Sequence, residues 1–171
     1  MGKRVSAIIL MLLGLSVTSA AQQEQAMGVP EHCRVTIPSD RPFVPPPPYE
    51  MDDPNETFSY GTDALWTRLP VDGTWRGLPH YTPNDPGFRQ KLIFGRLGYD
   101  PVEEPQPPLT LTGRRLDSPA PPLTADHANN GWVHQNQPFI VTGINLPTLG
   151  CWEITGHYKD QDLTFVIWVT Q

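Results

Sequence analysis

The sequence has few cysteines, few basic residues and no apolar segment of transmembrane length. Its 171 residues include 12 Lys and Arg against 18 Asp and Glu, a formal net charge of −6. This acidic balance argues against nucleic acid or anionic lipid as a partner, because both attract clustered lysine and arginine. The sequence also has no Gly-x-Ser-x-Gly motif and no Cys-x-x-Cys motif, which are typical of serine hydrolases and of redox or metal sites.

The histidines are spread along the chain rather than grouped at metal-ligand spacing. They are His32, His80, His127, His134 and His157. Only His127 and His134 flank one segment, and a spacing of seven residues in a loop is a weak metal signal. We therefore expect no catalytic residues, no metal and no cofactor. A small extracytoplasmic enzyme remains the alternative.

The N-terminus has the pattern of a secretory signal peptide. Lys3 and Arg4 precede the apolar run Val5–Val17, and small residues follow up to Ala21. About 13 apolar residues would span roughly 20 Å as a helix, too short for a hydrocarbon core of about 30 Å. We expect a signal peptide over 1–21, with cleavage after Ala20 or Ala21. The product would be secreted or periplasmic, without stable membrane insertion after cleavage, and the loss of two basic residues lowers its net charge from −6 to −8.

Two cysteines, Cys33 and Cys151, are the only ones in the sequence. In an oxidising compartment an isolated pair most often forms one structural disulfide. We therefore predict a Cys33–Cys151 disulfide, which would tie the beginning of the mature chain to a strand near its end.

Proline is the most unusual feature of the composition. The chain has 21 prolines, and all of them lie between Pro30 and Pro147. Because proline breaks helices and is excluded from central strands, we expect rigid loops between short strands. Residues 22–57 are polar and proline-rich, which predicts an extended N-terminal arm, and 58–171 form the predicted β domain.

Short apolar runs separated by turn residues predict strands along the β domain. Asp72-Gly73 lies between two aromatic-bearing runs, which is a strong hairpin signal. Segments 91–95, 109–112, 139–144, 150–158 and 163–169 are further predicted strands, and a polar loop is expected through Asn129–Gly131. The last strand is partly apolar on both faces. We expect either the arm or the Trp66/Trp75 hairpin to cover its outer face.

The strand pattern predicts an all-β, antiparallel β-sandwich. Leu146–Trp152, which enters a strand before a closing hairpin, resembles the last corner of immunoglobulin-like domains. The antibody cysteine pattern is absent, because Cys33 precedes the domain. We therefore expect an immunoglobulin-like β-sandwich with a proline-rich N-terminal arm.

Four motifs also resemble a group of uncharacterised exported bacterial proteins over about residues 60–170. They are Trp-x-x-Leu-Pro-x-Asp-Gly-x-Trp at 66–75, Thr-Gly-Arg-Arg-Leu-Asp at 112–117, Pro-Ala-Pro-Pro-Leu at 119–123 and Gly-Cys-Trp-Glu-Ile-Thr at 150–155. The resemblance implies export and a β domain, and it implies no activity.

Aromatic and arginine side chains are the candidate binding residues. Trp66, Trp75 and Trp132 could form a platform for sugar rings or an anchor for a protein, but for any one of them burial in the core is the favoured interpretation. Trp132 is expected to be the most exposed. Arg114 and Arg115 lie close to Asp117 and could recognise an anion or a partner, but an internal ion pair that fixes the turn is the favoured interpretation.

The sequence thus favours a non-catalytic exported interaction or structural module of the cell envelope. The expected partner is another envelope or extracellular protein, or carbohydrate. A small enzyme or a carbohydrate-binding domain is the alternative function.

Overall fold

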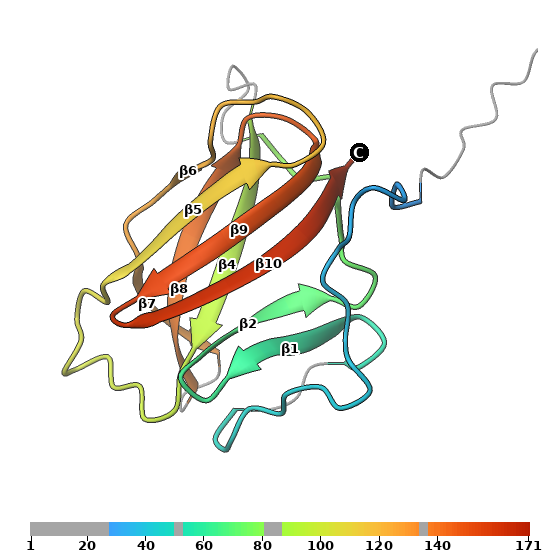
Figure 1. Cartoon of the computed structure of the whole chain (residues 1–171). Helices are drawn as coiled ribbons and strands as arrows, with labels where there is room; N and C mark the ends of the chain where they lie inside the picture. The colour runs from blue at the N-terminus through green and yellow to red at the C-terminus, as the bar shows by residue number, and fades with distance from the viewer. Residues whose placement is uncertain (1–27, 50–52, 81–86, 134–136) are drawn as a thin grey trace, which may run out of the picture.

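A computed structural model describes residues 28–49, 53–80, 87–133 and 137–171, and in these residues the protein is all-β (Figure 1). The predicted signal peptide lies outside the described residues. No helix long and apolar enough to cross a membrane occurs in the part of the chain that the structure describes. The strands are β1 (Thr57–Thr62), β2 (Leu65–Pro70), β3 (Thr74–Arg76), β4 (Phe88–Gly95), β5 (Leu109–Arg115), β6 (Thr124–Ala125), β7 (Asn129–Val133), β8 (Gln137–Leu146), β9 (Gly150–Tyr158) and β10 (Gln161–Thr170).

The strands form two sheets that face each other as a β-sandwich. The first sheet has the order β1-β2-β4-β8-β6, with β7 also paired to β8, and the second has the order β3-β10-β9-β5. All pairs are antiparallel except β3 with β10, which is parallel. In Figure 1 the second sheet lies in front of β4 and β8. The sandwich expected from the short apolar runs is therefore present.

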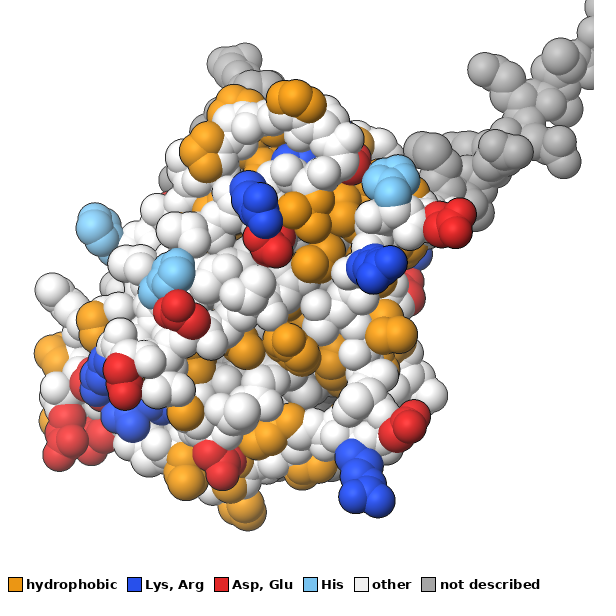
Figure 2. Space-filling model, in the orientation of Figure 1, with side chains coloured by type: hydrophobic (Ala, Val, Ile, Leu, Met, Phe, Trp, Pro, Cys, Tyr) orange, Lys and Arg blue, Asp and Glu red, His pale blue; other side chains and the backbone are white. Residues whose placement is uncertain are grey.

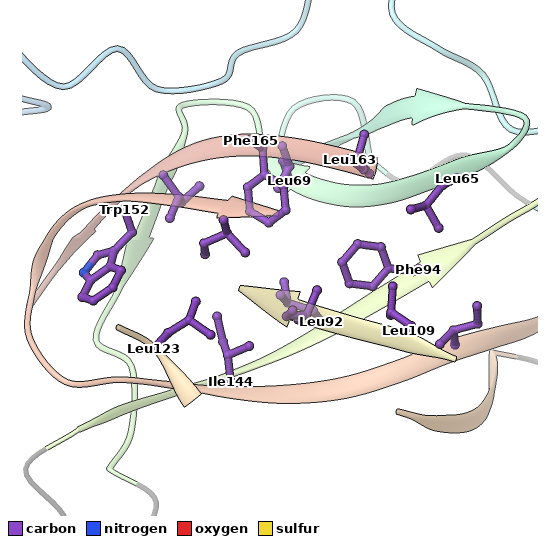
Figure 3. Close-up of a cluster of buried hydrophobic side chains, with 14 of the residues drawn as sticks. Leu65, Leu69, Leu92, Phe94, Leu109, Leu123, Ile144, Trp152, Leu163 and Phe165 are labelled. Carbon is purple, nitrogen blue, oxygen red and sulfur yellow. The ribbon is translucent and has the colours of Figure 1, made fainter. Parts of the chain in front are cut away.

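The core fills the space between the sheets (Figure 3). Alternate residues of β10 point into it, namely Leu163, Phe165, Ile167 and Val169, as the period-two pattern predicted. The same alternation buries Leu109 and Leu111 of β5. Each large aliphatic or aromatic side chain buried in this way stabilises the fold by about 1.5–3 kcal/mol relative to exposure.

The predicted hairpin around Asp72-Gly73 is wrong. β2 and β3 belong to different sheets, so the chain turns a corner there and crosses the sandwich. The turn itself is real, because Gly73 has φ +64° and its N–H donates to the Pro70 carbonyl. The Gly73 carbonyl then accepts a hydrogen bond from the Trp168 N–H, which directs the chain onto β10. The hairpin in this region joins β1 to β2 instead, and it turns at residues 63–64.

The polar loop expected through Asn129–Gly131 is also wrong. These residues begin β7, which pairs with β8 from Asn129↔Val141 to Val133↔Gln137. A Cβ on Gly131 would approach the Val141 side chain to 2.3 Å, so glycine allows close contact there. Backbone pairing with β8 accounts for this strand despite its polar composition, because an edge strand needs little apolar surface of its own.

The arm wraps one side of the sandwich. Cys33 is bonded to Cys151 of β9, with a Cα–Cα distance of 5.7 Å, so the predicted disulfide is confirmed. Thr36 exchanges hydrogen bonds with the Val166 main chain of β10. Farther along, Phe43 and Tyr49 contact Trp66 on the outer face of the first sheet.

The expected cover of the last strand is therefore only partly correct. Cys151 and its register partner Trp168 both point outward, so the disulfide places the start of the arm on the outer face of β9 and β10. Beyond Thr36 the arm leaves that face, and Trp168 stays half-buried. The Trp66/Trp75 segment does not form the expected hairpin and supplies no cover of that kind.

Candidate interaction site at the loop end

Two of the three candidate tryptophans are not available for binding. Trp66 is 1 % exposed and Trp75 is 7 % exposed. Trp66 lies beneath Phe43 and Tyr49 of the arm, with ring centroids 5.6 Å and 5.0 Å away. Trp75 meets the ring of Phe165 edge-on in the core. Both residues therefore stabilise the fold, and the core burial favoured for any single tryptophan is confirmed for Trp66 and Trp75.

Trp132 is exposed, as expected, although it lies on β7 rather than in a loop. Its exposed fraction is 58 %. Leu97, at 52 %, and Val102, at 85 %, are exposed on the loop 96–108 that connects β4 to β5. We call Leu97, Val102 and Trp132 the loop-end residues. In Figure 1 the 96–108 loop lies at the lower left of the molecule, and Figure 2 shows charged side chains beside hydrophobic ones on that side.

Glu104 fixes the 96–108 loop to the sandwich. Its carboxylate accepts hydrogen bonds from Arg96 Nη2 at 2.7 Å and from Lys159 Nζ at 2.8 Å. The Tyr158 hydroxyl donates to its second oxygen. Three donors from β9, the β9–β10 turn and the loop itself thus converge on one carboxylate. Charge-assisted bonds of this kind are stronger than neutral ones, so they hold the loop in one conformation.

The ionisation of these groups reflects the same contacts. Partial burial opposes the charged form of Glu104, but the hydrogen bonds from Lys159, Tyr158 and Arg96 outweigh it and lower the Glu104 pKa to about 2. Burial and the hydrogen bond to Glu104 raise the pKa of Tyr158. Glu104 is therefore a firmly ionised anchor at neutral pH, unlike a general acid or base, whose pKa lies near the working pH.

Asn130 connects β7 to the same loop. Its amide nitrogen lies 3.4 Å, 3.0 Å and 3.2 Å from the carbonyl oxygens of residues 101, 104 and 105. The Tyr99 hydroxyl donates to the Asn130 side-chain oxygen. Asn130 is two residues before Trp132, and residue 101 is the neighbour of Val102. The hydrogen bonds of Asn130 therefore bring the segments that carry Trp132 and Val102 together.

Arg114 and Arg115 do not form one site. They are successive residues of β5 and point to opposite faces of the sheet. Arg115 Nε lies 2.7 Å from Asp117, which also accepts the Cys151 N–H. Arg114 pairs with Glu153 at 2.7 Å on the surface. The favoured interpretation of an internal ion pair is confirmed for Arg115 and Asp117.

Histidines and acidic residues form no metal centre in the part of the chain that the structure describes. His127 lies in the segment between β6 and β7, whereas His134 lies outside the described residues. His157 contacts Asp162 and Thr112 on the surface.

No sequence pattern points to Glu104, Tyr99 or Asn130 as site residues. Glu104 lies in a proline-rich segment whose sequence is typical of a loop between strands. Its partners Tyr158 and Lys159 are more than 50 residues away in the sequence. Only the fold brings these residues together.

Comparisons of the chain with protein-family models, with curated proteins and with solved structures find no match.

Proposed function

We propose that the protein is an exported, non-catalytic interaction module that binds another envelope or extracellular protein through its loop end. The observation that carries this proposal is the combination of a fixed loop with exposed apolar side chains. Glu104 and Asn130 hold the 96–108 loop in place, while Val102 remains 85 % exposed. Binding by a rigid surface loses less conformational entropy, so an ordered apolar loop is well suited to recognition.

An immunoglobulin-like architecture is part of the proposal, and the strand order supports it. In such domains four strands have the order A-B-E-D in one sheet, and C, F and G form the other. The orders β2-β4-β8-β6 and β5-β9-β10 correspond to these sheets. β3 follows β2 after a corner in the chain and pairs with β10 in the second sheet. β2 and β3 together therefore correspond to a first strand that is divided between the two sheets. The Cys33–Cys151 disulfide departs from the pattern, because it fastens the arm instead of joining the two sheets.

Export is supported by the disulfide and by the leader pattern. Structural disulfides persist in oxidising compartments and are rare in the cytosol. Cys33 is 4 % exposed and Cys151 is fully buried, so the bond is part of the packed structure. These features agree with the N-terminal run of basic, apolar and small residues.

A protein partner is favoured over carbohydrate by the chemistry of the loop end. Sugar-binding platforms rely on aromatic faces, and Trp132 is the one candidate tryptophan found exposed among the described residues. Leu97 and Val102 add aliphatic surface, which suits the apolar centre of a protein interface.

Site-specific photo-crosslinking of the mature protein, in the envelope of the producing cell, tests this function. A photoreactive residue at Val102 or Trp132 should capture one protein in stoichiometric yield. The same residue at Thr110, which is exposed on the outer face of β5, should not. Equal capture at all three positions, or no capture together with turnover in an activity screen, would refute the proposal.

A further inference from the structure

The two sheet edges that meet on the arm side of the sandwich differ in how they are closed. The edge of β10 is occupied along most of its length. Gly77 donates to Thr170, Trp168 donates to Gly73, and Thr36 exchanges bonds with Val166. Thr164 is the next residue of β10 whose main-chain groups point away from β9. Its carbonyl accepts a hydrogen bond from the Tyr60 hydroxyl at 3.1 Å.

The edge of β1 is different. The alternation of hydrogen-bonded and non-hydrogen-bonded residue pairs between β1 and β2 shows which main-chain groups of β1 point away from β2. The Val71 N–H donates to the Glu56 carbonyl, so the pair 56/71 is hydrogen-bonded. Hydrogen-bonded pairs recur at every second residue of an antiparallel ladder, which makes 58/69, 60/67 and 62/65 the bonded pairs. The main-chain groups of Ser59 and Gly61 therefore point away from β2. Within the described chain they have no main-chain hydrogen-bond partner.

A groove runs along this edge, between β1 and the arm. Its volume is about 400 Å³. β1 lines it from Phe58 to Thr62, and the arm lines it with Ile37 and Phe43 among others. Arg41 is its one charged lining residue. In Figure 1 the arm passes beside β1 at this side of the molecule.

The free edge is suited to a further strand. Ser59 is only 9 % exposed as a residue, and main-chain N–H and C=O groups that water does not reach are rarely left without partners. The arm cannot supply a regular strand here, because Pro38, Pro42 and Pro45 have no N–H to donate. An extended main chain supplies both missing partners at the required spacing.

We propose that this groove binds an extended peptide segment of another protein, which pairs with Ser59 and Gly61 and extends the first sheet by one strand. Alternate side chains of the segment are apolar and contact Ile37 and Phe43 of the arm. A carboxylate on the segment pairs with Arg41. A second copy of this chain is disfavoured as the occupant, because two β1 edges paired about a twofold axis would bring two copies of Arg41 into one groove. This surface is separate from the loop-end residues and does not depend on their function.

Selection from a phage-displayed library of random heptapeptides, on the oxidised mature protein, tests the proposal. We expect enrichment of sequences that alternate apolar and polar residues and contain Asp or Glu. When a selected peptide binds, amide exchange at Ser59 and Gly61 should slow markedly. Exchange at Leu109 and Leu111, on the far edge strand β5, should not change.

Two variants locate the binding site. Ser59→Pro removes the outward N–H without removing a bond to β2, and it should abolish binding. Arg41→Glu should weaken the acidic peptide about tenfold. Arg34→Glu makes the same charge change at an exposed arm position outside the groove, and it should have no effect. If Ser59→Pro fails to fold, the peptide affinities of Arg41→Glu and Arg34→Glu still test whether the groove is the binding site.

The opposite outcomes overturn the inference. No enrichment above an unrelated β-sandwich protein would do so, and so would peptide binding that Arg41→Glu leaves intact. Slowed exchange at Leu109 and Leu111 instead of Ser59 and Gly61 would place the docking edge on β5.

Discussion

The two ends of the sandwich are each fixed by a carboxylate–arginine contact, yet they present different surfaces. At the disulfide end, Asp117 pairs with Arg115 and accepts the N–H of Cys151, so it ties a turn to the strand that carries the disulfide. At the loop end, Glu104 and its donors hold a loop whose apolar side chains face solvent.

This difference shows how similar anchors serve two purposes. Both carboxylates are largely buried by their partners, at 10 % and 15 % exposure. What differs is the neighbouring apolar surface. Near Asp117 the buried Cys151 and Trp152 belong to the packed structure and Leu116 is 42 % exposed, whereas near Glu104 the loop projects Leu97, at 52 %, and Val102, at 85 %, into solvent. We therefore interpret the disulfide end as stabilising and the loop end as presenting a binding surface.

The largest loss of unfolding free energy is expected from removal of the disulfide at the disulfide end. The double variant Cys33→Ser, Cys151→Ser is expected to lose about 2–5 kcal/mol of unfolding free energy, because the bond closes a long loop in the unfolded chain. Urea denaturation measures this loss, with the wild type under reducing conditions as a second estimate. An unchanged midpoint would show that the arm and its bond contribute nothing to stability.

Loss of Glu104 should affect the loop end more than the rest of the fold. Glu104→Ala leaves Arg96 and Tyr158 without their shared acceptor, which is expected to cost about 1–3 kcal/mol. Hydrogen exchange should become faster across residues 96–108 and remain slow in β9 and β10. Glu103→Ala, at the exposed neighbouring position, is the matched control. Equal exchange in the two variants would contradict the anchoring role.

Acid should weaken both ends together. The hydrogen bond from Arg115, aided by the Cys151 N–H, outweighs burial and lowers the Asp117 pKa to about 2. Glu104 also has a folded-state pKa of about 2, below its unfolded value. A depressed pKa adds stability that is complete above the unfolded value and is lost as the pH falls toward the folded value.

The urea midpoint should therefore decrease between about pH 4.5 and pH 2. The decrease should be smaller in Asp117→Asn and in Glu104→Gln, because each variant lacks one of the titrating groups. A urea midpoint of the wild type that does not change over this pH range would show that ionisation of Asp117 and Glu104 does not stabilise the fold.

The smallest effect is expected at Arg114. Its side chain is 73 % exposed and pairs with Glu153 on the surface, so Arg114→Ala should cost less than about 0.5 kcal/mol. Arg115→Ala should cost more, because it leaves the nearly buried Asp117 without its main partner. Thermal unfolding of the two variants side by side measures the difference. Equal losses would remove the distinction between a surface pair and an anchoring pair.

The sequence predicted the strands more reliably than their pairing. Local alternation was sufficient for β5, β9 and β10, because side-chain periodicity depends only on neighbouring residues. The Asp72-Gly73 turn was also recognised, but the sheet that receives the following strand depends on a bond between Trp168 and Gly73, 95 positions apart in sequence. No local pattern records such a contact.

The candidate site was predicted less well than the fold. The exposure of Trp132 and the Arg115–Asp117 pair were foreseen, since both follow from nearby residues. The burial of Trp66 agrees with the favoured interpretation, but its cover by Phe43 and Tyr49 of the arm was not predicted. Glu104 was missed because its donors come from distant strands.

The most direct test of the loop-end function is the affinity of the protein captured by crosslinking for variants of the two ends. Val102→Ser should weaken binding about tenfold, or ~1.4 kcal/mol, without lowering the unfolding midpoint. Leu116→Ser, at an exposed apolar position of the disulfide end, should leave the affinity unchanged. If Val102→Ser binds as tightly as the wild type, or if Leu116→Ser weakens binding equally, the loop end is not the binding surface.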